Sequence, residues 1–165
     1  MNANSFARLQ LLRVLVVDDE PYMRKVTKTI LAAIGVPTAL EAEDGITGYE
    51  MARSNVPDLM IIDWEMPVID GPQLIRMIRS PEEHLLRDIP VIMLTAHSDI
   101  SRVVESARIG ANEFVRKPVS IKTLRDRIVS IITNPRPLSK LENTTVRRRG
   151  DLHPSILIRS IKTLQ

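Results

Sequence analysis

Four short apolar runs in this sequence are each followed by polar residues, and this pattern restricts the fold more than any other feature. The runs do not alternate apolar and polar residues, as expected for strands buried on both faces of a parallel sheet. The runs and the polar residues after them are Val14–Val17 with Asp18 and Asp19, Leu59–Ile62 with Asp63, Val91–Leu94 with Thr95, and Phe114–Val115 with Lys117. Ligands of open α/β folds bind outside the carboxyl ends of the strands, so these polar side chains are expected to meet there. Three carboxylates, one hydroxyl and one ammonium indicate a site for a metal ion and a phosphoryl group.

Segments with helical spacing of apolar residues separate the predicted strands. The first predicted helix opens at Glu20-Pro21 and is ended by Gly35, and a short strand follows over 38–42. The other predicted elements are a helix from Asp44-Gly45 that stops before Asn55, helices over 71–79 and about 99–109, a strand over 113–116, and a helix with Ser120 as its N-cap. Strand and helix thus alternate five times. This predicts an α/β fold with a doubly wound (βα)5 sheet of five parallel strands in the order 2-1-3-4-5.

The chain length and a Pro-rich stretch define the expected domain organisation. A chain of 165 residues has the length of one domain with a tail. Periodicity fails from Asn134-Pro135-Arg136-Pro137 onward, so we expect an N-terminal extension over 1–11, a domain over 12–133 and a tail over 134–165. The tail has a net charge of +5, which leaves −2 for the remainder because the whole chain carries +3. The domain is slightly acidic, so nucleic-acid binding is not expected.

Composition excludes several other classes of protein. The chain is 44% apolar and 26% charged, and no apolar run approaches the roughly 18 residues that a membrane span needs. Residues 1–10 lack the apolar core of a signal peptide, so we expect a cytoplasmic protein without membrane attachment. The absence of cysteine excludes disulfides and thiolate metal sites.

The motifs around the polar residues resemble those of the receiver domain of bacterial two-component response regulators, a CheY-like, flavodoxin-like fold. The motifs are Asp18-Asp19-Glu20-Pro21, Asp63-Trp64-Glu65-Met66-Pro67 with Asp70-Gly71, Leu94-Thr95-Ala96, and Phe114-Val115-Arg116-Lys117-Pro118. From Asp18 to Asp63 to Thr95 to Lys117 the successive spacings are 45, 32 and 22 residues. Each motif alone is common in loops, but their combination over about residues 12–132 is specific.

The resemblance implies that Asp63 accepts a phosphoryl group, and the residue types fit this chemistry. A carboxylate nucleophile that approaches an anion needs a divalent cation to offset charge repulsion. We expect Asp18, Asp19, Asp63 and the main-chain carbonyl of Glu65 to hold Mg²⁺, with Mn²⁺ as an alternative ion. Lys117 would pair with Asp63 and then with a phosphoryl oxygen.

The resemblance also implies a switch. Thr95 would donate its hydroxyl to the phosphoryl group, and Phe114 would turn inward and repack the face formed by helix four, strand five and helix five. Plain core packing is the alternative role of Phe114. Glu65 and His97 are expected to tune the loss of the phosphoryl group to water, although His97 equally suits an ordinary helix start.

We therefore expect a single-domain response regulator that is a phosphoacceptor with limited autocatalytic activity and not a conventional enzyme. Its expected partners are a sensor histidine kinase or histidine phosphotransfer protein, and an effector that binds the phosphorylated form. Three alternatives remain: a phosphorelay shuttle or phosphate sink, a Mg²⁺-dependent phosphohydrolase that forms an aspartyl phosphate, and a phosphate-independent adaptor.

Trp64 and the tail depart from the simplest receiver pattern. Trp64 would either restrict access of the phosphodonor or cover apolar surface, and cover is favoured. The basic triplet Arg147–Arg149 is typical of a solvated segment, with contact to an acidic partner or a phosphate backbone as alternatives. The apolar stripe of Leu157, Ile161 and Leu164 can dock on this domain, on a second copy in a homodimer, or on another protein.

Overall fold

The computed structural model describes residues 3–97 and 100–134, which contain one sheet of five parallel strands. The strands are β1 Arg13–Val17, β2 Thr38–Ala42, β3 Leu59–Asp63, β4 Val91–Thr95 and β5 Glu113–Arg116. Their order is β2-β1-β3-β4-β5, which confirms the predicted topology. Every residue of the central strand β3 and of β4 is buried, which accounts for the apolar runs in the sequence.

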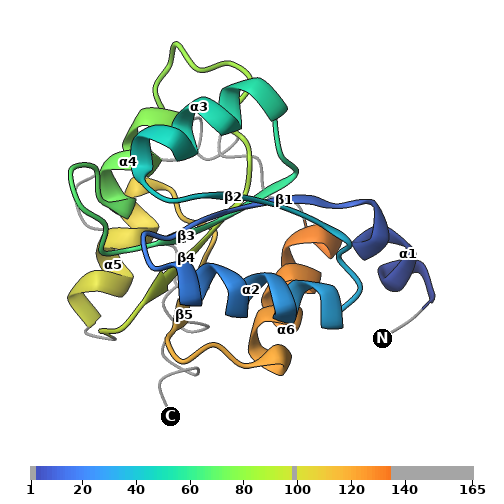
Figure 1. Cartoon of the computed structure of the whole chain (residues 1–165). Helices are drawn as coiled ribbons and strands as arrows, with labels where there is room; N and C mark the ends of the chain where they lie inside the picture. The colour runs from blue at the N-terminus through green and yellow to red at the C-terminus, as the bar shows by residue number, and fades with distance from the viewer. Residues whose placement is uncertain (1–2, 98–99, 135–165) are drawn as a thin grey trace.

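Helices cover both faces of the sheet (Figure 1). The helices are α1 Ala3–Leu11, α2 Pro21–Ala33, α3 Gly45–Asn55, α4 Gly71–Ile78, α5 Ile100–Ile109 and α6 Ile121–Thr133. Successive strand residues point to opposite faces, so β1 contributes Leu15 to one core and Val16 to the other. The first core lies between the sheet and α3, α4 and α5, and the second lies under α1, α2 and α6.

The N-terminal extension forms a helix that the sequence patterns did not predict. Leu9 of α1 is fully buried in the second core, together with Leu31 and Ile34 of the neighbouring chain segment. Arg8 Nη1 donates a 2.8 Å hydrogen bond to the main-chain oxygen of Ile132 near the end of α6. Helix α1 thus packs against α6 and adds a sixth helix to the five βα units.

Local signals set the helix ends close to their predicted positions. The Ser120 hydroxyl accepts a hydrogen bond from the main-chain nitrogen of Thr123, which confirms its role as an N-cap. Gly35 follows α2 with a φ of +96°, a left-handed conformation that favours glycine. Helix α3 includes Asn55, and α4 ends at Ile78, so both of these predicted ends were wrong by one residue. Residue 99, the predicted start of α5, lies outside the described residues.

The predicted tail also lies outside the described residues, except for its first residue, Asn134. Helix α6 ends at Thr133, the last residue of the predicted domain. The basic triplet 147–149 and the apolar stripe 157–164 fall beyond residue 134, so the expectations for them stay predictions. Among the helices within 3–97 and 100–134, none has the length and hydropathy to cross a membrane.

Candidate functional site

The parallel strands place the predicted site residues at one edge of the sheet. Asp63 pairs in register with Leu94, and Thr95 with Arg116, so the ends of β3, β4 and β5 lie side by side. Main-chain hydrogen bonds continue past these ends: Trp64 N donates to Leu94 O at 2.8 Å, and Lys117 N donates to Thr95 O at 2.7 Å. The strand pairing therefore extends to the residues directly after β3 and β5.

The Lys117 ammonium joins two of the predicted carboxylates. Lys117 Nζ lies 2.8 Å from Asp63 Oδ1 and 3.0 Å from Asp18 Oδ2. Asp18 is 1% exposed and Asp63 is 6% exposed, so both charges depend on this partner. Burial would lower the pKa of Lys117, but its hydrogen bonds with Asp63 and Asp18 outweigh this effect and raise the pKa. Lys117 is therefore cationic at neutral pH.

The environment of Asp63 makes it unusual among the carboxylates of residues 3–97 and 100–134. Burial raises the pKa of Asp63 from its ordinary value of 3.8 to about 6, and the charge of Asp18 acts in the same direction. Lys117 opposes this shift through its hydrogen bond and its charge. A buried carboxylate with a raised pKa beside a fixed cation is typical of a functional site.

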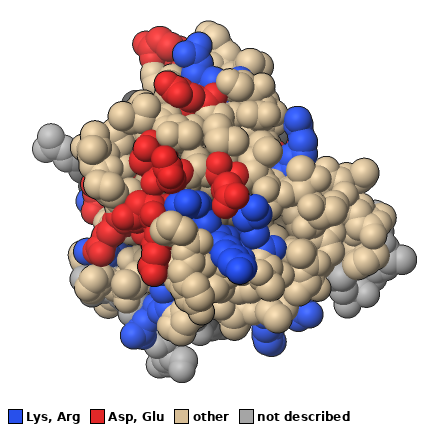
Figure 2. All heavy atoms as spheres, viewed as in Figure 1, with Lys and Arg blue, Asp and Glu red and all other residues tan. Residues whose placement is uncertain are grey.

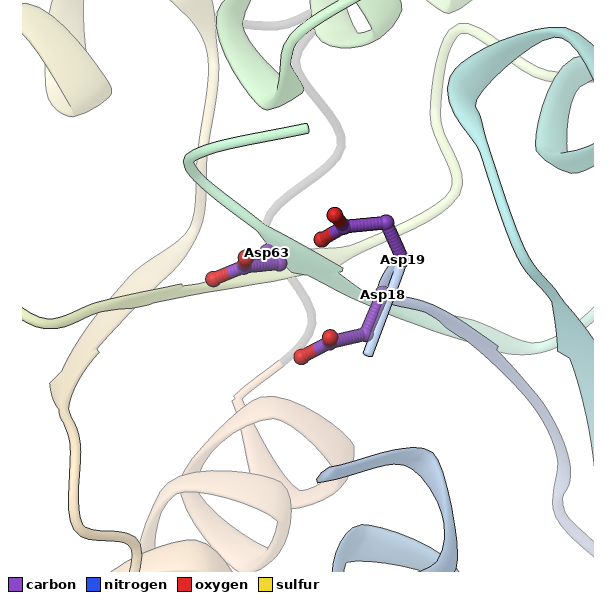
Figure 3. A group of neighbouring side chains, drawn as sticks. All are labelled: Asp18, Asp19 and Asp63. Carbon is purple, nitrogen blue, oxygen red and sulfur yellow. The ribbon is translucent and has the colours of Figure 1, made fainter. Parts of the chain in front are cut away.

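Asp18, Asp19 and Asp63 form an acidic cluster at the strand ends. One carboxylate oxygen from each residue lies within 4.8 Å of the others. Figure 2 shows acidic and basic side chains gathered side by side on one face of the molecule. Figure 3 shows the three side chains, from the ends of β1 and β3, directed into the same region beyond the sheet. Three hard oxygen donors at this spacing fit Mg²⁺, because this ion prefers carboxylates completed by water. Glu65, the predicted fourth ligand through its carbonyl, lies in the loop directly after Asp63.

Two further residues, Arg24 and Gly71, pack against the backbone of this site. Arg24, in the first turn of α2, donates hydrogen bonds from Nη1 to the main-chain oxygens of Asp18 at 2.8 Å and Asp19 at 3.3 Å. Gly71 lies so close to the site that a Cβ atom there would come within 2.3 Å of the main-chain oxygen of Asp63. The sequence patterns missed Arg24, although a side chain in the first helical turn leans back toward the preceding strand end.

Thr95, Glu65 and His97 lie at the mouth of the site. Thr95 is fully buried, and its hydroxyl oxygen accepts a 3.1 Å hydrogen bond from the main-chain nitrogen of His97. Glu65 Oε1 lies 3.3 Å from His97 Nδ1 and 2.9 Å from Arg102 Nη1. The hydrogen bond from Arg102 lowers the pKa of Glu65, so this carboxylate is charged at neutral pH. The predicted rate-tuning pair, Glu65 and His97, is thus in direct contact. The sequence patterns missed Arg102 of α5, which contacts Glu65.

The two aromatic residues of interest are both buried. Trp64 is 8% exposed and belongs to the first core, and Arg102 Cζ lies 5.2 Å from its ring centroid. This packing is what the predicted role as apolar cover requires. Phe114 is 7% exposed in the same core, so its ring already occupies the inward position. The predicted switch role of Phe114 stays a prediction.

Comparison with known proteins supplies the family. Residues 14–129 match the model of the response regulator receiver domain. This chain belongs to the receiver domain family. It is 35% identical over 120 residues to the chemotaxis protein CheY of Pseudomonas aeruginosa, covering 73% of this chain and 95% of that protein. It is 34% identical over 120 residues to CheY-3 of Vibrio cholerae, covering 73% and 91% of the two chains.

A solved receiver structure agrees with the fold. The crystal structure of a CheX–CheY–BeF₃–Mg²⁺ complex from Borrelia burgdorferi matches this receiver with a TM-score of 0.69 and 25% identity. The match covers 74% of this chain and 90% of that chain. The two-component signalling class and the CheY-like fold expected from the motifs are therefore confirmed.

Proposed function

We propose that this receiver accepts a phosphoryl group on Asp63 from a histidine kinase or a histidine phosphotransfer protein in a Mg²⁺-dependent reaction. The observation that carries the proposal is the position of Asp63, which is buried beside the Lys117 ammonium and the carboxylates of Asp18 and Asp19. Lys117 Nζ is 2.8 Å from Asp63 Oδ1, and the oxygens of Asp18 and Asp19 are within 4.8 Å of an oxygen of Asp63. This arrangement offers one nucleophile, one fixed cation and one cation site.

The residues have distinct roles in the transfer. An oxygen of Asp63 attacks the phosphorus atom, the new O–P bond forms, and the bond from phosphorus to the donor nitrogen breaks as the histidine leaves. Lys117 stabilises the negative charge on the phosphoryl oxygens, and Thr95 donates its hydroxyl to one of them. Asp18, Asp19, Asp63 and the carbonyl of Glu65 would hold Mg²⁺ or Mn²⁺, and the bound ion would supply charge neutralisation.

The proposed output is a contact with an effector protein through the face formed by α5, β5 and α6. Ile100 at the start of α5 is 64% exposed, and Ile121 at the start of α6 is 50% exposed. Phe114 of β5 packs in the first core beneath α5, and Thr95 pairs in register with Arg116, two residues further along β5 toward α6. A shift of Thr95 toward a phosphoryl group therefore has a short structural route to both helices. Because the Phe114 ring is buried in this structure, the proposed switch requires the ring to turn outward in the alternative conformation.

Glu65 and His97, two positions after Asp63 and Thr95, are proposed to control the lifetime of the phosphorylated form. Glu65 is charged and paired with Arg102, which favours a role in repelling or orienting water over a role as a proton donor. His97 is exposed beside it. The ion pairs of Glu65 also weigh against the phosphohydrolase alternative, which needs a free acid–base group near the nucleophile.

Intact-mass measurement tests the proposal. The protein is incubated with Mg²⁺ and acetyl phosphate or phosphoramidate, and Asp63→Asn is the matched control. We expect a gain of one phosphoryl mass that needs Mg²⁺ and is absent in the control. A gain on the control would place the acceptor elsewhere, and no gain on the native protein would favour the phosphate-independent adaptor. Multiple turnover on p-nitrophenyl phosphate would support the phosphohydrolase, and preferential onward transfer to a phosphotransfer protein would support the shuttle.

A further inference from the structure

Arg102 of α5 contacts three residues at the mouth of the site. Its Nη1 donates a 2.9 Å hydrogen bond to Glu65 Oε1 and lies 3.5 Å from the Thr95 hydroxyl oxygen. Its guanidinium carbon lies 5.2 Å from the centroid of the Trp64 ring. The Arg102 side chain is 25% exposed, so the guanidinium is held by these contacts and is not an extended surface group. Such planar, stacked and paired positions suit arginine better than lysine.

The same guanidinium lines a hollow that leads to the acidic cluster. The hollow has a volume of about 440 Å³, and its walls are formed by Asp19, Trp64, Glu65, Met66, Pro67, Asp70 and Arg102. Three of these residues carry negative charge, and Arg102 is the single basic residue among these seven. A phosphodonor is itself an anion, so an uncompensated Glu65 carboxylate at this mouth would oppose its approach.

We propose that Arg102 is a positioning residue for phosphoryl transfer to Asp63, because it neutralises the Glu65 carboxylate and ties Thr95 to α5. This inference rests on the proposed function of Asp63. Removal of the guanidinium has opposite consequences for the two charged species that the site receives. The mouth becomes more negative, which weakens the approach of an anionic donor and strengthens the binding of a cation. If the substitution only disordered the site, it would instead weaken both phosphoryl transfer and cation binding.

Three variants of the full chain test the proposal: Arg102→Ala, Arg102→Lys and the double variant Arg102→Ala/Glu65→Gln. The initial rate of phosphoryl gain from acetyl phosphate is followed by intact mass at saturating Mg²⁺. Mg²⁺ affinity is measured separately by fluorescence of Trp64, the one tryptophan of the chain, which adjoins Asp63. For Arg102→Ala we expect a rate about fivefold lower and Mg²⁺ binding a few-fold tighter. Adding Glu65→Gln to Arg102→Ala should return both values most of the way to those of the native protein. Arg102→Lys should also bring both values most of the way back.

A matched control separates these effects from a general change in α5. Arg76 Nη2 lies 3.2 Å from Glu105 Oε1 of α5, and both side chains are about half exposed and outside the hollow. Arg76→Ala removes an ion pair between an arginine and the same helix, α5, and should leave the phosphorylation rate and the Mg²⁺ affinity unchanged. Equal losses for Arg76→Ala and Arg102→Ala would overturn the proposal.

The two measurements also separate the inference from the proposed function. If the native protein gains no phosphoryl mass, the proposed function fails, and the Mg²⁺ titration alone decides the role of Arg102. If the native protein is phosphorylated and Arg102→Ala reacts at the same rate, only the inference fails. Mg²⁺ binding that is unchanged or weaker in Arg102→Ala would overturn the inference in either case.

Discussion

Lys117 Nζ lies 2.8 Å from Asp63 Oδ1, although 54 positions separate the two residues in the sequence. The contact exists because β3 and β5 flank β4 and all three strands end at the same edge of the sheet. Lys117 is 16% exposed and also contacts Asp18, so one ammonium compensates two buried carboxylates. Such a cation keeps a nucleophilic carboxylate charged and stabilises the negative charge of an incoming phosphoryl group.

Replacement of Lys117 should therefore affect both charge and reaction. In Lys117→Ala we expect the pKa of Asp63 to rise further above about 6, and phosphoryl gain from acetyl phosphate to slow by more than tenfold. Intact mass gives the rate, and carboxyl NMR of the metal-free protein gives the pKa. Lys117→Arg keeps the positive charge but replaces the compact ammonium with a planar guanidinium. It should therefore preserve the free energy of unfolding better than the phosphorylation rate. Phosphorylation of Lys117→Ala at the native rate would contradict the assignment.

Stability of the metal-free protein should fall as pH rises through the range in which Asp63 ionises. Its pKa is about 6 in the folded chain and 3.8 as the ordinary value, so the folded state binds more protons between these values. Unfolding then becomes easier with rising pH over this window, and the trend from this residue ends above about pH 6.

Asp63→Asn isolates this contribution. The variant should be more stable than the native protein by on the order of 1–3 kcal/mol at pH 7, and the difference should shrink toward pH 4. Urea unfolding at several pH values with EDTA present measures it, and other titrating groups cancel between the two proteins. A difference that stays constant from pH 4.5 to 7.5 would show that Asp63 does not titrate as proposed.

Most of the fold and the centre of the site follow from local patterns. Apolar runs such as Leu59–Ile62 predict buried strands, and a polar residue directly after each run predicts the site because parallel strands end together. The residues Asp18, Asp63 and Lys117 were found in this way. Helix ends marked by a cap, such as Ser120, were equally accessible.

The missed features depend on partners that are distant in the sequence. Helix α1 is short, and Leu9 is buried only because α2 and α6 cover it. Arg102 reaches Glu65, which is 37 positions away, through a long side chain whose direction no sequence pattern specifies. The sequence offered one indication, the position of Arg102 in the first turn of the helix after Thr95. This position points to Arg102 only when the orientation of the helix relative to the sheet is known.

Val68 should be replaceable with a gain in stability. It has a φ of +67° in the loop after Asp63 and is 84% exposed, so a β-branched residue adopts a left-handed conformation without burial in return. Val68→Asn should stabilise the protein by about 1 kcal/mol, because asparagine tolerates this conformation. The free energy of unfolding of Val68→Ala, measured in urea, should lie between those of the native protein and Val68→Asn. An asparagine variant less stable than the native protein would mean that Val68 makes contacts that outweigh the strain.

Removal of one charge from the acidic cluster tests whether it binds Mg²⁺. Asp19 is exposed, whereas Asp18 and Asp63 are buried, so Asp19→Asn should change the free energy of unfolding little. It removes one of three anionic ligands and should weaken Mg²⁺ binding by roughly tenfold or more. A titration followed by Trp64 fluorescence, checked by calorimetry, measures the affinity.

Glu43 supplies the control for this experiment, because it is an exposed acid that follows β2 at the same edge of the sheet and lies outside the cluster. Glu43→Gln removes the same unit of charge but no ligand, so only a small through-space weakening is expected. The two effects also differ in their response to salt: screening diminishes the Glu43 effect, whereas direct ligation by Asp19 keeps a large difference at 0.5 M KCl. Equal weakening by both variants would reduce the cluster to a diffuse negative potential and remove Asp19 from the metal site.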